Sequence, residues 1–348
     1  MEHRKIELVE YTHDKNLIKR YCYFLMHHYQ EDIRINQYIL ELKRLLLTDN
    51  PFFNYANIKN FIAINDSGVL GHVSAIIDNR LKGIGIMGFY DCIDDIQTSN
   101  LLLGNAVEYL RNNKCSIIRG PINFSIWHGY RFIENQKRKQ IIFDPFNKDY
   151  YVKFWQDFGF KIVERYVSAV RSDFNYVLPY TKSQYEMNVK EGFKIREFDK
   201  NNSEEELKLI HNLSKKIFYD SWNQVDISFQ EFYYIYQNII DKIEPYFFEI
   251  VETKESEPVG FSFAIPNPFS EKQLIIKTMG VLKEYQGNKL ASTFMYSQHT
   301  KAKEKGFNEC YYPLIRIGNN ISKFPYQGYE IITKYLAFEL CFLNSSKN

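Results

Sequence analysis

Residues 279–291 combine the features that a protein needs to bind a phosphate group. An apolar strand pattern ends at Val281, a polar turn follows, and a helical pattern begins at Leu290. Successive backbone N–H groups at the start of such a helix form a nest for a pyrophosphate, and glycine lets the phosphate approach. A strand–helix turn that binds nothing is the plainer interpretation. The candidate binding residues are Met279, Gly280, Val281, Gln286, Gly287, Asn288, Lys289, Leu290 and Ala291.

A second group of residues that could do chemistry lies in residues 120–130. Asn123, Ser125 and His128 supply polar groups there, and aromatic residues alternate with them. Pockets lined by aromatic side chains with a few polar groups are typical ligand sites, so we predict that these three residues bind substrate. Hydrogen bonds within the loop itself are the commoner use of such side chains, and that interpretation stays open.

The elements that would position these residues occur twice in the same order. The first series has helical patterns at 14–25, 38–47, 101–110 and 147–158, and strand patterns at 61–64, 69–77, 84–90, 115–118 and 163–170. In the second series, helical patterns begin at 203, 229 and 290, and strand patterns lie at 194–198, 246–251, 259–264, 274–281, 310–315 and 331–340. Ser203 followed by Glu206 predicts a capping box.

This repeated order predicts an α/β (α+β) fold of two tandem domains, each a mixed, mostly antiparallel sheet flanked by helices. We expect an N-terminal domain at residues 1–174, a linker at 175–190 and a C-terminal domain at 191–348. The first copy carries extra residues at 120–145. Its counterpart of the phosphate turn, residues 94–102, lacks glycine and begins with Asp94-Asp95, which would repel a polyanion. We interpret the two carboxylates as a favourable charge at a helix start.

Composition excludes several classes of protein. The 348 residues carry a net charge of +2, whereas a dedicated nucleic-acid-binding protein normally has a strong basic excess. No apolar run approaches the ~20 residues that span a bilayer, and the first residues lack a secretory pattern. The five cysteines are scattered without a metal-binding spacing, so we expect no metal and a reducing, cytoplasmic location.

The order of elements in each half resembles the GNAT acyltransferase fold. The acyl-CoA loop of that family reads Gln/Arg-x-x-Gly-x-Gly/Ala; here Gln286 and Ala291 fit, and Lys289 replaces the middle glycine. Asn-Pro-Phe-Phe at 50–53 and Gly-Pro-Ile-Asn-Phe-Ser at 120–125 are similar to motifs of a bacterial tandem-GNAT family whose chemistry is poorly assigned. Residues 144–151 and 159–160 continue that resemblance, which covers nearly the whole chain.

The resemblance implies acyl-CoA, acetyl-CoA in the simplest case, as a cosubstrate bound by residues 279–291. Lys289 could pair with a phosphate of the coenzyme. Tyr326 would be the acid that protonates the leaving thiolate, and Asn320 would contact the coenzyme. Glu249 lies on a strand near the expected site, but we expect it to be an exposed carboxylate, which leaves the catalytic base unassigned.

These observations together predict a CoA-dependent N-acyltransferase that acts on a small-molecule amine, with the C-terminal domain binding acyl-CoA. Two alternatives stay open. One is a non-catalytic protein that binds CoA or an acyl ligand. The other is an aminoacyl-tRNA-dependent transferase, although no basic patch for the tRNA is evident. We expect no nucleic acid and no membrane among the partners, and a homodimer is compatible with the sequence.

Overall fold

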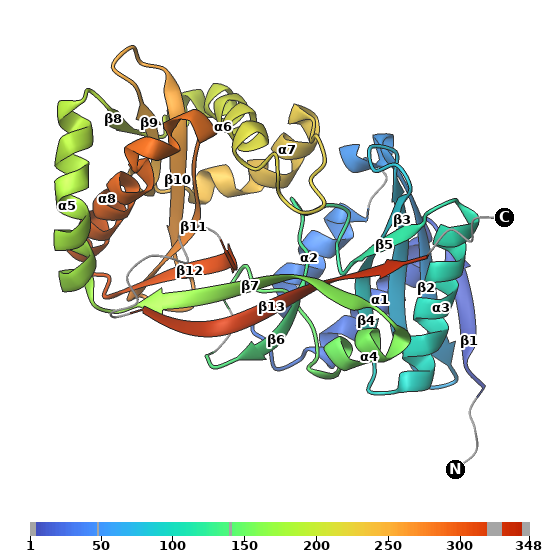
Figure 1. The fold of residues 1–348 in the computed structure, drawn as a ribbon. Coiled ribbons are helices and arrows are strands. Elements are labelled where there is room, and N and C mark those ends of the chain that lie inside the picture. The colour runs from blue at the N-terminus through green and yellow to red at the C-terminus, as the bar shows by residue number, and fades with distance from the viewer. Residues whose placement is uncertain (1–4, 47–48, 139–140, 319–328, 343–348) are drawn as a thin grey trace. The chain divides into compact units, whose positions relative to one another are not determined.

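The computed structural model describes residues 5–46, 49–138, 141–318 and 329–342 (Figure 1). The chain forms two compact units that exchange segments. Unit 1 comprises residues 1–135, 145–165 and 335–348, and unit 2 comprises residues 136–144 and 166–334. The predicted domains follow the order of the chain, whereas the units take strands from both halves. Residues of the predicted linker lie in helix α5 (Phe174–Lys190) of unit 2.

Unit 1 is a sheet in the order β1-β2-β3-β4-β5-β13, antiparallel except for β4 beside β5. Its strands are β1 (Glu7–Tyr11), β2 (Ala56–Asn65), β3 (Gly68–Asp78), β4 (Ile84–Cys92), β5 (Ile117–Gly120), most of β6 (Phe132–Gln136), the first part of β7 (Lys161–Arg171) and the last part of β13 (Tyr329–Cys341). Its helices are α1 (Lys15–His28), α2 (Ile35–Leu45), α3 (Ile96–Asn112) and α4 (Tyr150–Phe158), with a 3-10 turn η1 (Pro51–Asn54).

Helices cover both faces of the unit 1 sheet. Val73 and Ala75 of β3 pack with α3 in the core, whereas Tyr21 of α1 stacks on His72 with ring centroids 4.0 Å apart. Since successive residues of a strand point to opposite faces, α1 and α3 lie on opposite faces. Asp14 caps α1 as predicted, because its side chain accepts hydrogen bonds from two backbone N–H groups.

Unit 2 repeats this design in the order β7-β12-β11-β10-β9-β8, with β11 and β12 as the parallel pair. Its strands are the last part of β7, β8 (Lys194–Glu197), β9 (Phe248–Glu252), β10 (Pro258–Pro266), β11 (Gln273–Val281), β12 (Glu309–Arg316) and the first part of β13. Its helices are α5, α6 (Ser203–Ile217), α7 (Phe229–Tyr236) and α8 (Leu290–Glu304), with 3-10 turns η2 (Lys200–Asn202), η3 (Gln237–Lys242), η4 (Pro245–Phe247) and η5 (Lys283–Asn288).

Helices α5 and α8 lie side by side on one face of the unit 2 sheet (Figure 1). Phe174 of α5 and Met295 of α8 share an apolar core with Leu274 and Ile276 of β11. Gly280 faces α6 instead, because an added Cβ would lie 2.6 Å from Ile217 Cγ2. The predicted fold class is therefore confirmed: each unit is a mixed, mostly antiparallel sheet flanked by helices.

Helix α6 begins at Ser203 as predicted, but the capping box predicted for its start is wrong. Asn202 is the N-cap of α6 without a side-chain hydrogen bond, and Ser203 is the first helical residue. The carboxylate of Glu206 instead forms an ion pair with Arg196, whose Nη1 lies 2.8 Å away. A capping box does occur at the start of α7, where Ser228 and Glu231 bond reciprocally.

Candidate functional site

The pairing of β11 with β12 ends early. Within the described strands, the parallel ladder joins only Gln273, Leu274 and Ile275 to the start of β12. Beyond Ile275, β11 continues to pair with β10 on its other side, with a bulge at the step between Ile276 and Thr278. Residues 276–281 therefore have one edge outside any ladder of the described sheet, and this edge leads directly to the predicted phosphate turn.

The turn itself combines an unusual backbone with an uncapped helix. Lys289, which replaces the glycine of the motif, adopts the left-handed conformation with φ 52° and ψ 35°. Its N–H donates to Gln286 O at 3.1 Å, and its carbonyl accepts from Ser292 N at 2.9 Å. The side chain of the N-cap residue, Lys289, makes no hydrogen bond to the backbone of the first turn of α8. The helix start therefore keeps the positive end of its dipole available to an anion.

The remaining candidate residues of this segment lie around the same turn. Met279 packs against the apolar core, and Val281 and Leu290 are buried. Gln286 is exposed and donates weakly to Val281 O at 3.4 Å. An added Cβ at Gly287 would meet no described atom within 4 Å, so this part of the turn is open. The structure thus brings the candidate segment together; its binding of a ligand stays a prediction. Tyr326 and Asn320 lie outside the described residues.

The equivalent edge in unit 1 is occupied by the chain itself. The ladder of β4 with β5 joins Ile84–Ile86 to residues 117–119. Beyond it, Ile122 N donates to Met87 O at 2.8 Å, and Phe89 N donates to Asn123 Oδ1 at 2.7 Å. The backbone at Ile122 lies so close to β4 that an added Cβ at Gly88 would be 1.9 Å from Ile122 O. Asn123 therefore closes this edge through its side chain.

The start of α3 in unit 1 also differs from the start of α8. Asp95 is the N-cap of α3, and its carboxylate accepts from Thr98 N at 2.8 Å. This confirms the interpretation of Asp94-Asp95 as a helix-start feature, at least for Asp95. A helix start that already holds a carboxylate has no place for a phosphate.

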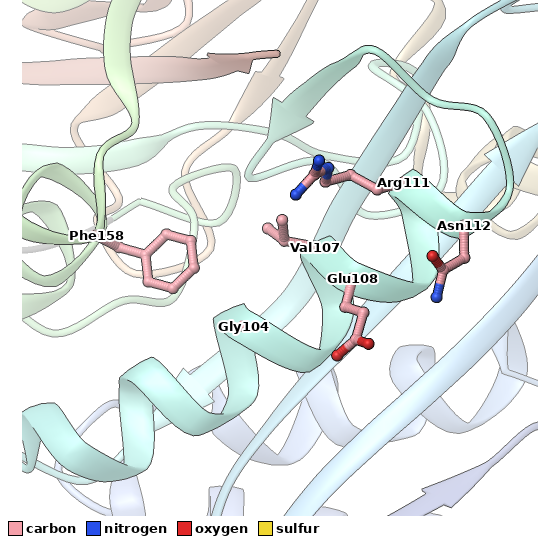
Figure 2. Close-up of a pocket in the computed structure, with 6 residues that line it drawn as sticks. All are labelled: Gly104, Val107, Glu108, Arg111, Asn112 and Phe158. Carbon is pink, nitrogen blue, oxygen red and sulfur yellow. The ribbon is translucent and has the colours of Figure 1, made fainter.

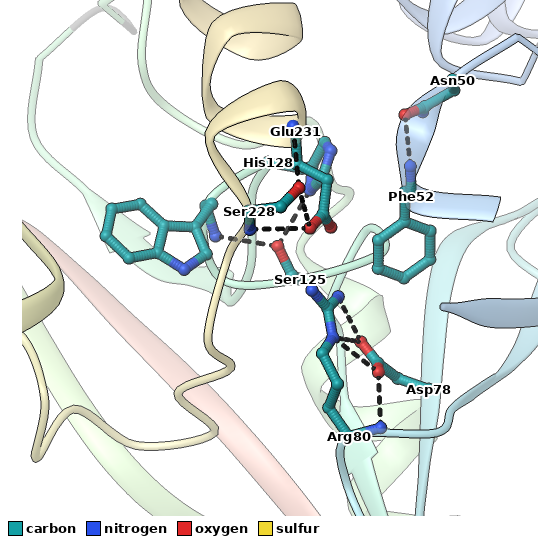
Figure 3. A network of polar contacts seen from close by, with 9 residues as sticks. Asn50, Phe52, Asp78, Arg80, Ser125, His128, Ser228 and Glu231 are labelled. Atoms are coloured by element: carbon teal, nitrogen blue, oxygen red, sulfur yellow. Dashed lines mark hydrogen bonds and ion pairs between the residues drawn. The ribbon is translucent and has the colours of Figure 1, made fainter. Parts of the chain in front are cut away.

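Ser125 and His128 form a local polar network in unit 1 (Figure 3). Ser125 Oγ lies 2.9 Å from His128 Nδ1 and accepts from Trp127 N at 3.3 Å. The imidazole packs edge-on against Phe52 and Phe124. Burial, with added repulsion from Arg44 and Arg80, lowers the pKa of His128 to about 3, so the ring is neutral at pH 7. The predicted contacts of Asn123, Ser125 and His128 with substrate stay predictions.

The Asn-Pro-Phe-Phe segment at residues 50–53 stabilises the chain next to this network. Asn50 caps η1 by accepting from Phe52 N at 3.1 Å (Figure 3), and its amide donates to Leu45 O at 2.9 Å. Asn50 is buried, and a buried amide needs such partners. The ring of Phe52 is thereby held against Phe124 with centroids 4.6 Å apart.

The expectation that Glu249 is exposed is wrong. Its side chain is fully buried between β9 and α8, where Lys301 Nζ lies 3.0 Å away and Gln298 Nε2 donates at 3.1 Å. Ser297 also donates to the carboxylate. Burial raises the pKa of Glu249, although the ion pair with Lys301 opposes the rise. Glu249 is therefore part of the packing of α8.

Sequence reasoning missed a buried carboxyl in unit 1. Asp91 of β4 accepts hydrogen bonds from Tyr21 at 2.5 Å and from Tyr29 at 2.6 Å, and Tyr151 lies at 3.5 Å. Burial raises the pKa of Asp91 to about 7, and the three hydroxyl groups limit that rise. An aspartate inside the apolar strand 84–92 was the available signal, but its three partners lie 60 to 70 positions away.

In unit 2, a buried hydrogen bond joins His299 of α8 to Tyr312 of β12. His299 Nδ1 lies 2.6 Å from Met295 O, which can only accept, so this nitrogen carries the proton. Tyr312 Oη then donates to His299 Nε2 at 2.5 Å. Burial lowers the pKa of His299 to about 4, so the imidazole is neutral. Tyr312 is the first residue of β12 beyond its ladder with β11.

A hollow on α3 is a less suitable ligand site than the turn before α8. This hollow of about 480 Å³ is open to solvent, and Figure 2 shows its charged side chains on the exposed side of the helix. Its lining residues are Gly104, Val107, Glu108, Arg111, Asn112 and Phe158. In the described part of the chain, no cluster of three His, Cys, Asp or Glu residues could hold a metal ion. No described helix is both long and apolar enough to cross a membrane.

Comparison with known proteins supports the fold. No family model matches the sequence, and neither does any curated protein. Among solved structures, a tandem GNAT protein from the clavulanic acid biosynthesis pathway aligns with a TM-score of 0.58 at 8% identity, over 97% of this chain and 98% of its own. A conserved protein from Enterococcus faecalis V583, described as a probable N-acyltransferase, aligns with a TM-score of 0.59 at 9% identity, over 97% of this chain and 73% of its own.

A third structure is the GCN5-related glucosamine N-acetyltransferase region of a fungal multi-domain β-N-acetylglucosaminidase. It aligns with a TM-score of 0.58 at 13% identity, over 97% of this chain but only 38% of that protein. These identities are low, so the similarity concerns the fold. The chain has the tandem-GNAT fold along nearly its whole length.

Proposed function

We propose that this chain is a CoA-dependent N-acyltransferase that transfers an acyl group, acetyl in the simplest case, to a small-molecule amine. Two structural neighbours are described as an N-acetyltransferase region and as a probable N-acyltransferase, which supports the reaction class. We place the acyl-CoA site in unit 2, at the turn between β11 and α8.

One observation carries this proposal. The turn keeps the left-handed backbone at Lys289 although glycine is absent, and α8 follows without a side-chain cap. This conformation costs an L-residue about 1–2 kcal/mol. Retention of a strained turn before an uncapped helix suits an anion that needs the N–H groups. The residues present therefore fit the diphosphate of a coenzyme.

The chain would contribute positioning and charge. The first N–H groups of α8 would bind the diphosphate, and the Lys289 ammonium would neutralise part of its charge. The edge of β11 at residues 276–281 offers backbone groups for the amides of an extended pantetheine arm. Acyl-CoA supplies the acyl group as a thioester, which an unprotonated amine can attack.

Proton transfer completes the reaction. The amine loses a proton when the C–N bond forms, and the thiolate gains one when the C–S bond breaks. Tyr326 remains our candidate for the acid. Glu249 is excluded as a solvent-accessible base because it is buried beneath α8.

Unit 1 would not take a second coenzyme. Its β4 edge is occupied by Ile122 and Asn123, and Asp95 already caps α3. We therefore infer one acyl-CoA site in each chain.

The test combines binding with turnover. Acetyl-CoA binding, measured by calorimetry, should weaken at least tenfold in Gln286→Ala and vanish in Ala291→Asp, which places a carboxylate beside the diphosphate. Gln97→Ala is the matched control, since Gln97 is an exposed residue in the first turn of α3. A panel of amines with thiol-release detection then identifies the acceptor. Binding without thiol release from any amine would instead support the non-catalytic alternative.

A further inference from the structure

Helix α5 lies along α8 in unit 2 and belongs to the stretch that the sequence presents as a linker. Asp173 caps its start by accepting from Asn175 N at 2.9 Å. Phe174 and Val177 then join the apolar core that contains Met295 of α8. This packing fixes the position of α5 against α8, so polar residues farther along α5 are held near the start of α8.

Those polar residues form a continuous hydrogen-bonded chain. Gln184 Nε2 donates to Asn188 Oδ1 at 3.2 Å and to Asn288 O at 3.3 Å. Asn188 Nδ2 donates to Thr293 Oγ1 at 2.6 Å. Asn188 is fully buried and Thr293 is 2% exposed, so these bonds replace water that neither side chain can reach.

The chain of bonds ends on the peptide unit that precedes the strained residue. The carbonyl of Asn288 accepts from Gln184, and the N–H of the same peptide unit, which belongs to Lys289, donates to Gln286 O at 3.1 Å. Both polar groups of this peptide are therefore fixed. The orientation of that peptide plane determines the φ of Lys289, which is 52°.

We propose that α5 is a positioning element for the coenzyme site: Gln184 and Asn188 hold the turn at 286–289 in the shape that binds the diphosphate of acyl-CoA. This inference rests on the proposed function. Its physical basis is preorganisation, because apparent affinity falls in proportion to the fraction of molecules whose site is in the binding shape. If loss of the Gln184 hydrogen bond leaves about a tenth of the molecules with the turn in that shape, affinity for the coenzyme falls about tenfold.

The test compares donor and non-donor side chains at position 184 in the full chain, with coenzyme A as the probe in calorimetry. Gln184→Ala should weaken binding about tenfold. Gln184→Met keeps the length of the side chain, has no donor for Asn288 O and adds no charge beside the turn, so it should weaken binding as much as Gln184→Ala. Ser183→Ala, at the exposed neighbouring position of α5, is the matched control and should bind as wild type.

Structural damage is separated by a second measurement. Hydrogen exchange of residues 282–293 should accelerate in Gln184→Ala, whereas the core strands β9 and β10 should exchange as in wild type. Undiminished coenzyme A binding by Gln184→Ala or by Gln184→Met would overturn the positioning role alone. If wild type itself binds no coenzyme A, the proposed function fails and the inference fails with it.

Discussion

Replacement of Lys289 by glycine tests the strained turn directly. The residue is exposed, and its backbone has φ 52° and ψ 35°. An L-residue in this conformation costs about 1–2 kcal/mol, and glycine does not incur that cost. Glycine loses more backbone freedom on folding, which offsets about 0.5–1 kcal/mol. Lys289→Gly should therefore raise the free energy of unfolding by roughly 0.5–1 kcal/mol.

Alanine provides the matched control. Lys289→Ala keeps the Cβ and hence the strain, so its stability should stay within about 0.5 kcal/mol of wild type. Thermal unfolding followed by circular dichroism measures the difference, and about 2 °C between the glycine and alanine variants is expected for a unit of this size. If Lys289→Gly is less stable than Lys289→Ala, the left-handed conformation at this position is refuted.

The same pair separates backbone from charge in coenzyme binding. Both variants lose the ammonium, so both should bind acetyl-CoA more weakly than wild type at low ionic strength, by about threefold to tenfold. The difference should shrink in high salt, because the lysine is exposed and its charge is screened. Equal affinity of wild type and both variants at low salt would show that Lys289 does not contact the phosphates.

Three further predictions concern the packing around the sites. Wild type should lose up to about 4 kcal/mol of stability as pH rises from 4 to 8, because folded Asp91, with a pKa of about 7, keeps a proton that the unfolded chain releases. Asp91→Asn lacks this loss and should therefore gain stability relative to wild type over that range; a pH-independent difference in urea unfolding would contradict this. Wild type should lose up to roughly 3 kcal/mol of its free energy of unfolding as pH falls from 6.5 to 4, because the unfolded chain binds a proton at His299 that the buried imidazole, with a pKa of about 4, does not. His299→Gln should remove this part of the pH dependence; an unchanged fall in stability between pH 6.5 and 4 would count against the prediction. Gly88→Ala should destabilise the protein by more than about 3 kcal/mol, because the added Cβ would lie 1.9 Å from Ile122 O. Gly287→Ala should be nearly neutral, and similar melting temperatures of the two variants would show that the β4 edge is not closed.

Local patterns in the sequence were enough to predict most elements and the fold class. Apolar alternation marked the strands of both halves, and side-chain chemistry marked helix starts at Asp14 and Asp95. The capping box at Ser203 failed because a nearby cation, Arg196, competes for Glu206. A motif of two residues cannot report such a competitor.

Long-range pairing was the part that could not be predicted. The last strand, β13, pairs with β5 of unit 1 from Phe338 to Cys341, more than 200 positions away. The partners of Asp91 and the contact of Asn123 with Phe89 likewise depend on folding, since no local pattern links those positions. Glu249 was expected to be exposed, and no local pattern could show that α8 covers its side of β9.

The phosphate turn shows the same limit on a smaller scale. Resemblance to the family motif identified Gln286 and Ala291, and Lys289 replaces the middle glycine of that motif. The structure shows that Lys289 keeps the left-handed backbone, and that Gln184, from outside the motif, contacts the turn. The backbone conformation, rather than the residue type, is the better evidence for the site.

The stoichiometry of acetyl-CoA binding tests the central claim most directly. Equilibrium dialysis of the full chain with labelled acetyl-CoA should saturate at one molecule per chain, because only the β11 edge and the α8 start suit the coenzyme among the described residues. Ala291→Asp should abolish that binding, and Gln97→Ala should leave it intact. Absence of saturable binding, or two equivalents per chain, would contradict the account.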